Sequence, residues 1–358
     1  MTELNKENAD DWKEKLRSAF ISAFSGNPQE NIQVYTEVGY YYMCCAPSSL
    51  YKYYSDRQEK LETVKHNKMW YSAPCNFNDV FDCDMSMDEE GIFQSILQMY
   101  PDKRGIREGS PIWRDLLKTC RQQIRTFQSS YDILKSRVGI SCLSESDDSL
   151  LMWAHYANSN TGICVEYDFN DQKLKPLYKK MVFPVAYSQE PIDLRDLLAD
   201  EKQQVYQYPL YAAVLCAALN KARDWSYENE WRLVLVWSMA KNYECRLQLI
   251  APSVPKSIAF GYHFMKPFFY YNYKNEQERY LASERLFDMM RLLEYIKAQQ
   301  IPALIMAPSI GGYTLVRKPI EINSLMQLIS CHFEDNNPED MRYYYVVHDK
   351  LMDLLEKE

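Results

Sequence analysis

The stretch that decides the fold is RVGISCLSESDDSLLMWAHYANSNTGICVEYD, residues 137–168. Residues 137–143 form a short, mostly apolar run typical of a buried strand, and an acidic turn follows at 144–148. Residues 149–156 have the apolar spacing of a short helix, and 162–167 return to a strand. The unit lacks the regular βαβ rhythm of a parallel sheet.

The same patterns extend outward on both sides of this unit. Helices are predicted at 8–25, 56–67, 193–222 (with one interruption at Pro209) and 277–299. Strands are predicted at 50–53, 68–72, 182–187, 231–237, 257–262, 302–307 and 343–347. The strands outnumber the crossover helices that a parallel sheet would need. The pattern therefore predicts an α+β fold with a largely antiparallel sheet core.

Two helical segments are expected to lie outside this core. Residues 1–48 predict an N-terminal helical extension. Residues from about 88 to 137 have helical periodicity and a polar surface, which predicts a helical insertion. Residues 49–358 are then expected to form a single α+β domain that carries this insertion.

Composition limits the class of protein. The chain has 358 residues, a net charge of −8 and 14% aromatic residues. The acidic balance argues against non-specific binding to nucleic acid, which needs a basic surface. No signal peptide or long apolar run is visible, which predicts a cytoplasmic protein without membrane contact. The ten cysteines include no CxxC pair, so we expect reduced thiols and no zinc ribbon.

Four motifs are rich in residue types that carry chemistry: LYKYYS (50–55), WYSAPCNFNDVFD (70–82), SCLSE with MWAHYA (141–157), and WSYENEWR (225–232). In this order they resemble the motifs of the bacterial domain-of-unknown-function 2971 family. The resemblance covers roughly residues 50–240. One departure is Val80, where the family typically has proline. This family supplies no activity.

A second resemblance is weaker. The strand, helix and strand that open the core are similar to ADP-ribosyltransferase-like enzymes, which carry His or Arg on a first strand, Tyr or Ser on a second and Glu in a late ExE motif. The matching positions are Lys52, Tyr53, Tyr71, Ser72 and Glu228-Asn229-Glu230. Lysine at 52 departs from that pattern. The resemblance implies NAD as substrate, an ADP-ribosyltransferase or NAD-glycohydrolase reaction, and a role in phage defence or as a toxin.

The implied chemistry needs a carboxylate beside the ribose. Breaking the nicotinamide–ribose bond builds positive charge on the sugar, which Glu230 would stabilise. Period-2 alternation would put Glu228 on the same strand face. Tyr71 could stack on nicotinamide with Ser72 nearby, and Lys52 could hold the amide or a phosphate. Alternatively, the glutamates form a cross-strand ion-pair ladder with Arg232, and Lys52 is a solvated strand residue.

Each of the other polar candidates for the site has two interpretations, one functional and one structural. His155 suits a general base at neutral pH, or it is satisfied by a backbone partner. Asn78 and Asp79 are candidates for the ligand site, or they cap a helix or lock a turn. Together with Asp82 they lack a recognised ligand spacing, so no metal site is predicted. Cys142 could be a nucleophile, but its strand position favours burial.

Two functions from different classes remain open. If the protein is an enzyme, we expect the motif residues to converge on one cleft that binds a small-molecule ligand, with a protein or nucleic acid as acceptor. A non-catalytic ligand- or protein-binding module predicts an aromatic-rich groove without a convergent carboxylate and donor pair. A glutamate with a strongly raised pKa in the cleft would count against the binding module.

Overall fold

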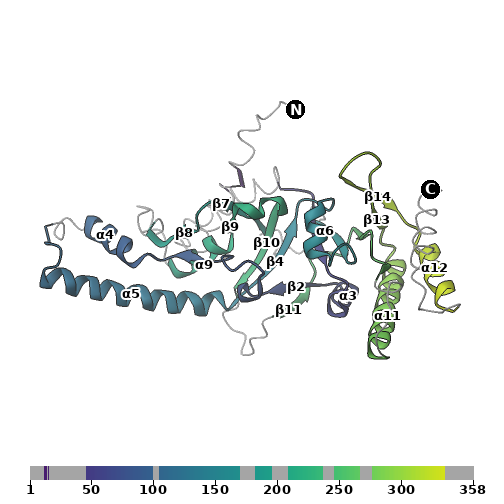
Figure 1. Cartoon of the computed structure of the whole chain (residues 1–358), viewed down its shortest axis with the longest axis horizontal. Helices are drawn as coiled ribbons and strands as arrows, with labels where there is room; N and C mark the ends of the chain where they lie inside the picture. Colours follow the sequence, from purple (N-terminus) through teal and green to yellow (C-terminus); the bar gives the residue numbers. More distant parts are fainter. Residues whose placement is uncertain are drawn as a thin grey trace.

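A computed structural model describes residues 12, 13, 15, 46–99, 105–169, 182–195, 209–236, 246–266 and 276–334 (Figure 1). Ten strands within these residues form one sheet: β1 (Ser49–Tyr54), β2 (Lys68–Ser72), β4 (Val138–Ser144), β5 (Ile163–Asp168), β6 (Val182–Pro184), β10 (Glu230–Val236), β11 (Arg246–Ile250), β12 (Ser257–Phe260), β13 (Ala303–Pro308) and β14 (Leu315–Pro319). All pairings in this sheet are antiparallel except β12 with β13. The predicted α+β fold with a largely antiparallel sheet is confirmed.

Strand β4 has three partners, and this positions the site. One edge of β4 pairs with β10 over the whole strand, from Val138 to Ser144. Strand β4 also pairs with β2, where Ile140 lies opposite Ser72, and with β1, where Ser144 lies opposite Tyr51. An antiparallel partner occupies a whole edge, so β1 and β2 must share the edge of β4 that β10 leaves open. The main chain around Cys142 lies between these two pairings.

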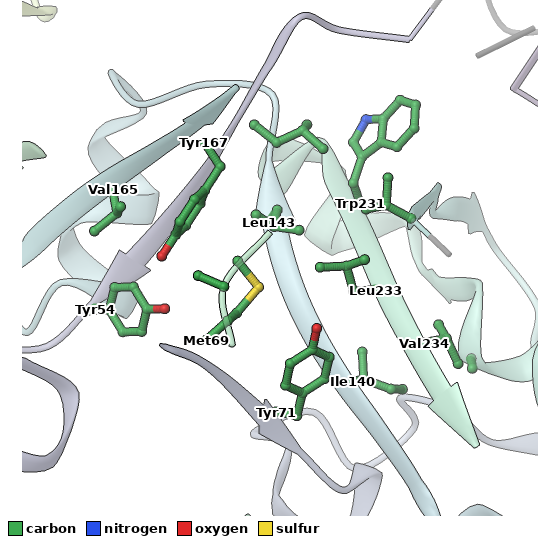
Figure 2. Packing of buried hydrophobic residues seen from close by; sticks show 14 of the residues in the cluster. Tyr54, Met69, Tyr71, Ile140, Leu143, Val165, Tyr167, Trp231, Leu233 and Val234 are labelled. Carbon is green, nitrogen blue, oxygen red and sulfur yellow. The ribbon is translucent and has the colours of Figure 1, made fainter. Parts of the chain in front are cut away.

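Apolar residues of the central strands form the core on both faces of the sheet, since Ile140 pairs with Val234 whereas Leu233 pairs with Ser141. Figure 2 shows Met69 and Tyr71 of β2 among Ile140 of β4 and Leu233 of β10. All four side chains are almost fully buried. Burying a side chain of this size stabilises the fold by about 1.5–3 kcal/mol.

The helices of the described chain are α3 (Gln58–Lys65), α4 (Glu89–Met99), α5 (Pro111–Lys135), α6 (Leu150–Tyr156), α9 (Pro209–Ala218), α11 (Glu276–Gln299) and α12 (Ile322–Glu334). Some helices pack against the sheet, such as α6 on β1 and α3 on β2, and others extend from it (Figure 1). Figure 1 shows α4 and α5 extending from one end of the molecule and α11 and α12 at the other. Ser110 caps α5 by accepting from the amide of Trp113, and Pro111 fits the first helical turn. Both α4 and α5 lie within the predicted helical insertion.

Short elements complete the described chain. Two 3₁₀ helices, η2 (Pro74–Asn76) and η5 (Arg223–Glu228), lie next to the site. Two small parallel pairs join β3 (Met85–Ser86) with β8 (Ile192–Asp193), and β7 (Ala186–Ser188) with β9 (Asn220–Ala222).

Some predicted elements differ or lie outside the described residues. Within the described part of the helix predicted at 193–222, residues 194–195 and α9 are helical, whereas 220–222 form strand β9; residues 196–208 lie outside the described residues. Strand 343–347 and nearly all of the extension at 1–48 lie outside the described residues. The division at residue 48 stays a prediction.

The expectations about membrane spans and about cysteine thiols can be compared with the described chain. None of its helices has the length and apolar character that a membrane-spanning segment needs. Six cysteines with described side chains are free thiols: Cys75, Cys83, Cys120, Cys142, Cys164 and Cys216.

Candidate functional site

A pocket of about 400 Å³ lies beside β4, where β1 and β2 share its edge. Its walls come from β1, β2, β4, α6, the loop around η2, and the turn between η5 and β10. Each of the four sequence motifs contributes side chains to this one pocket. The structure therefore brings together segments that lie up to about 180 residues apart in the chain, from Tyr51 to Glu230.

The most buried part of the site is an ion-pair network centred on Arg232. Its guanidinium donates to both carboxylate oxygens of Asp82, at 2.8 and 2.7 Å. It also donates to both oxygens of Glu230, at 2.9 Å each, and to the carbonyl of Ala218. Arg232 has no exposed surface. Bidentate pairing with two carboxylates offsets the free-energy cost of removing the guanidinium from water.

Lys221 of β9 joins this network to Glu228. Its ammonium lies 2.5 Å from Glu228, 3.4 Å from Glu230 and 3.6 Å from Asp82. The other oxygen of Glu228 accepts from the hydroxyl of Tyr156 on α6, at 2.5 Å. Glu228 is thus held by one cationic and one neutral donor, and it is 2% exposed.

A turn, and not a strand face, brings the two glutamates together. Glu228 ends η5, Asn229 adopts a left-handed conformation at φ 43°, and β10 begins at Glu230. Asparagine visits this region more readily than most residues. The hydroxyl of Ser144 donates to the carbonyl of Glu228, and the amide of Glu145 donates to that of Asn229. The prediction that period-2 alternation aligns Glu228 with Glu230 is therefore wrong, although both carboxylates contact Lys221.

The two carboxylates have pKa values displaced in opposite directions. Burial, followed by the charge of Glu230, raises the pKa of Glu228 to about 7, against the opposing effects of Lys221 and Tyr156. Burial also acts to raise the pKa of Glu230, but the charges of Arg232 and Lys221 outweigh it and lower that pKa to about 2. Neighbouring carboxylates separated in this way are typical of a division between a proton-transfer group and a permanent anion.

On β1, Lys52 and Tyr53 both line the pocket. Lys52 is 8% exposed, and its ammonium donates to the carbonyl of Cys142 at 3.0 Å. Burial lowers the pKa of Lys52. The hydroxyl of Tyr53 donates to the carbonyl of Ser146, and its ring packs edge-on against Trp153. The structure thus does not place Lys52 in solvent.

On β2, the predicted role of Tyr71 needs correction. Ser72 lines the pocket, as expected, but Tyr71 is 1% exposed in the core and is not a lining residue. Successive strand residues point to opposite faces, and Tyr71 points into the core. The aromatic residue of β2 that lines the pocket is Trp70, whose ring centroid lies 3.3 Å from the ammonium of Lys60. Tyr71 therefore cannot stack on a ligand in this pocket.

Asn78, Asp79 and His155 lie at or near the rim. Asn78 lines the pocket and its side chain bonds to the hydroxyl of Tyr156. Asp79 is not among the lining residues; its carboxylate accepts from the amide of Phe81 at 2.9 Å, which is the turn-locking role. His155 lines the pocket, and its Nδ1 lies 2.8 Å from the hydroxyl of Tyr227, not against a backbone group.

Cys142 also lines the pocket, but burial and the charge of Glu230 raise the pKa of its thiol. A protonated thiol is a poor nucleophile, which argues against cysteine chemistry here. The described residues contain no group of three or more His, Cys, Asp or Glu side chains arranged to hold a metal ion.

Sequence reasoning missed Lys221, Tyr156 and Trp70 as site residues. Each lies inside or next to a quoted motif: Tyr156 in MWAHYA, Trp70 in WYSAPC, and Lys221 seven residues before Glu228. A lysine that close to two buried glutamates is the signal that could have identified the network. Its position depends on β9, which the sequence had suggested to be helix.

The fold and the pocket define an α+β protein in which four motifs enclose one aromatic and ionic site. Residues 152–233 match the model of the family described as "Protein of unknown function (DUF2971)", which confirms the family resemblance over α6 to β10. No curated protein and no solved structure gives a significant match to the chain.

Proposed function

We propose that this protein is an enzyme that breaks the nicotinamide–ribose bond of NAD, as an ADP-ribosyltransferase-like enzyme or an NAD-glycohydrolase. The observation that carries the proposal is the pair of pocket carboxylates with separated pKa values, Glu228 near 7 and Glu230 near 2. Enzymes place such perturbed groups at sites of proton transfer and charge stabilisation.

The charge of the network suits a reaction that builds positive charge on a sugar. Its three carboxylates, Asp82, Glu228 and Glu230, contact two cations, Lys221 and Arg232. Three negative and two positive charges leave one negative charge when Glu228 is ionised, and none when it is protonated. An ionised Glu228 would therefore stabilise a developing oxocarbenium ion in the pocket.

Glu228 also has the pKa of a general base that works at neutral pH. It would accept the proton of a water or acceptor hydroxyl as that oxygen attacks the ribose. Tyr156, which donates to Glu228, would orient the carboxylate, and Glu230 would remain an anion held by Arg232. This differs from the sequence-based proposal, in which Glu230 was the central group.

The pocket has the size and lining for part of a nucleotide. Ligand sites span roughly 300–1,000 Å³, and the observed 400 Å³ suits a ring with its sugar, while the rest of a dinucleotide would lie outside. Trp70 and Phe77 offer aromatic surfaces to such a ring.

The alternative is a binding module with an aromatic groove. One observation favours it: Arg232, Lys221 and their partners are buried and largely satisfy one another, as a structural network would. That alternative expects no convergent carboxylate of raised pKa, however, and Glu228 has one. A place in bacterial defence or as a toxin, and a cytoplasmic location, stay predictions.

The test is nicotinamide release from NAD by purified protein, with and without cell lysate as a source of acceptor. We expect release by the wild type, loss of release in Glu228→Gln, and full release in Glu166→Gln. Glu166 is a matched control because it pairs with Lys256 and Ser257 and does not line the pocket. NAD binding without release under either condition would overturn the enzyme and leave the binding module.

A further inference from the structure

Lys52 differs from the two cations of the buried ion-pair network. Arg232 contacts two carboxylates and Lys221 contacts three. Within the described chain, the ammonium of Lys52 makes a hydrogen bond to the carbonyl of Cys142 and lies 5.5 Å from the ring of Tyr54. It makes no ion pair with a carboxylate among those residues. The side chain is nevertheless more than nine-tenths buried, at 8% exposed.

The position of Lys52 follows from the edge of β4 that two strands share. Cys142 lies between the residues of β4 that pair with β1 and with β2, and its carbonyl accepts from Lys52. This contact uses one of the three donors of the ammonium. Lys52 also lines the pocket, so a group bound in the pocket can reach the remaining N–H donors of its ammonium.

A buried ammonium without a counter-charge is costly. Burial lowers the pKa of Lys52, in keeping with this cost. A single carbonyl offsets only part of the lost hydration, whereas an anion entering the pocket would supply charge as well as acceptors. The ammonium is a compact charge that binds oxyanions without requiring two-fold geometry.

We propose that Lys52 forms an oxyanion subsite of the pocket, which binds a phosphate or carboxylate group of a small ligand. Glu228 and Glu230 line the same pocket and would repel that group. The ligand would therefore place its oxyanion at Lys52 and a neutral or cationic part beside the glutamates. The proposal of this subsite depends on the geometry of the pocket and does not require that the protein cleaves NAD. If NAD is the substrate, Lys52 would bind one of its charged groups.

The test measures anion binding without NAD. Thermal shift and titration calorimetry would compare inorganic phosphate with acetate, at constant ionic strength set by chloride. The proteins are wild type, Lys52→Met, Lys52→Arg and Lys256→Met. Lys256 is a matched control because it is exposed, pairs with Glu166 and does not line the pocket. Losing one charge-assisted hydrogen bond should weaken binding roughly tenfold or more in Lys52→Met, with partial rescue in Lys52→Arg.

A second measurement needs no variant. Amine acetylation of the wild type, followed by peptide mass spectrometry, would show slower modification of Lys52 when the anion is present, and unchanged modification of Lys256. Protection by phosphate alone or by acetate alone would identify which oxyanion binds. Anions that neither stabilise the wild type nor protect Lys52, or that bind Lys52→Met as tightly as the wild type, would overturn the subsite. Nicotinamide release is a separate readout, so either proposal can fail alone.

Discussion

The hydroxyl of Tyr156 donates to the carboxylate of Glu228 at 2.5 Å, although the two residues are 72 positions apart. This bond joins α6 to the turn before β10, which are the two ends of the segment that matches the family model. Asn78, from the loop around η2, bonds to the same hydroxyl. Tyr156 therefore links three of the four motifs through a single oxygen atom.

Replacing Tyr156 by phenylalanine should change the proton affinity of Glu228. The hydrogen bond from Tyr156 lowers the pKa of Glu228, so Tyr156→Phe should raise that pKa above its value of about 7. The pH profile of nicotinamide release, or a carboxyl NMR titration, would report the shift. Tyr227→Phe is the control, since Tyr227 contacts His155 at the rim. An unchanged pKa in Tyr156→Phe would contradict the assigned contact.

The raised pKa of Glu228 makes stability depend on pH. Glu228 goes from its ordinary 4.5 to about 7 on folding. Between these values the folded protein holds a proton that the unfolded chain has released, so its contribution is present below about pH 4.5 and is lost as pH rises to 7. Glu230, lowered to about 2, acts with the opposite sign, and its contribution is lost only as pH falls from 4.5 towards 2.

Urea unfolding at pH 5 and pH 7.5 would measure this effect. The wild type should lose about 2 kcal/mol more than Glu228→Gln between the two pH values, on the scale of 1.4 kcal/mol for each pKa unit. Equal pH dependence in both proteins would mean that Glu228 titrates in its ordinary range.

Removing the charge of Glu230 should destabilise the fold. Glu230→Gln leaves Arg232 and Lys221 buried with one carboxylate fewer, and breaking a buried pair costs about 3–5 kcal/mol. Glu62→Gln, which removes a partly exposed partner of Lys65 on α3, should cost no more than about 1 kcal/mol. Thermal and urea unfolding would compare the two. A Glu230→Gln variant as stable as Glu62→Gln would show that the network tolerates the loss.

Gly162 should not accept a side chain. A Cβ there would lie 2.1 Å from the carbonyl oxygen of Tyr54 and 3.1 Å from Ala157, and both obstacles are main-chain atoms. Gly162→Ala should cost about 3 kcal/mol or more, because the main chain at Tyr54 and Ala157 would have to move away from residue 162. Gly105, with no atom within 4 Å of its Cβ position, is the control. Comparable unfolding midpoints for Gly162→Ala and Gly105→Ala would refute the close approach.

Much of the sheet could be predicted because its strands are short apolar runs between clear turns. The strand at 68–72 is observed with the predicted bounds, and the strand at 137–143 is shifted by one residue. The exposed strand β14 escaped prediction because most of its residues face solvent and it has no apolar run. Tertiary pairing with β13, and not local pattern, makes it a strand.

The sequence predicted which residues belong to the candidate site better than it predicted how they are arranged. Lys52, Ser72, His155 and both glutamates do line one pocket. The sequence could not show which aromatic residue of β2 faces the pocket. Trp70 and Tyr71 are both aromatic, and period-2 alternation does not say which face of the strand is turned to the core. The two glutamates come together because Asn229 between them adopts a left-handed conformation. The residue pattern of a strand gives no sign of such a single-residue turn.

The two strands that share one edge of β4 have a consequence for how this fold can diversify. The width of the opening is set by main-chain pairing, opposite Ser144 on one side and Ile140 on the other. Exchanging a wall residue such as Trp70 or His155 would alter what is held without altering the frame. Ligand selectivity can therefore change at these two wall positions while the strand pairing and the buried pair of Glu230 with Arg232 stay fixed.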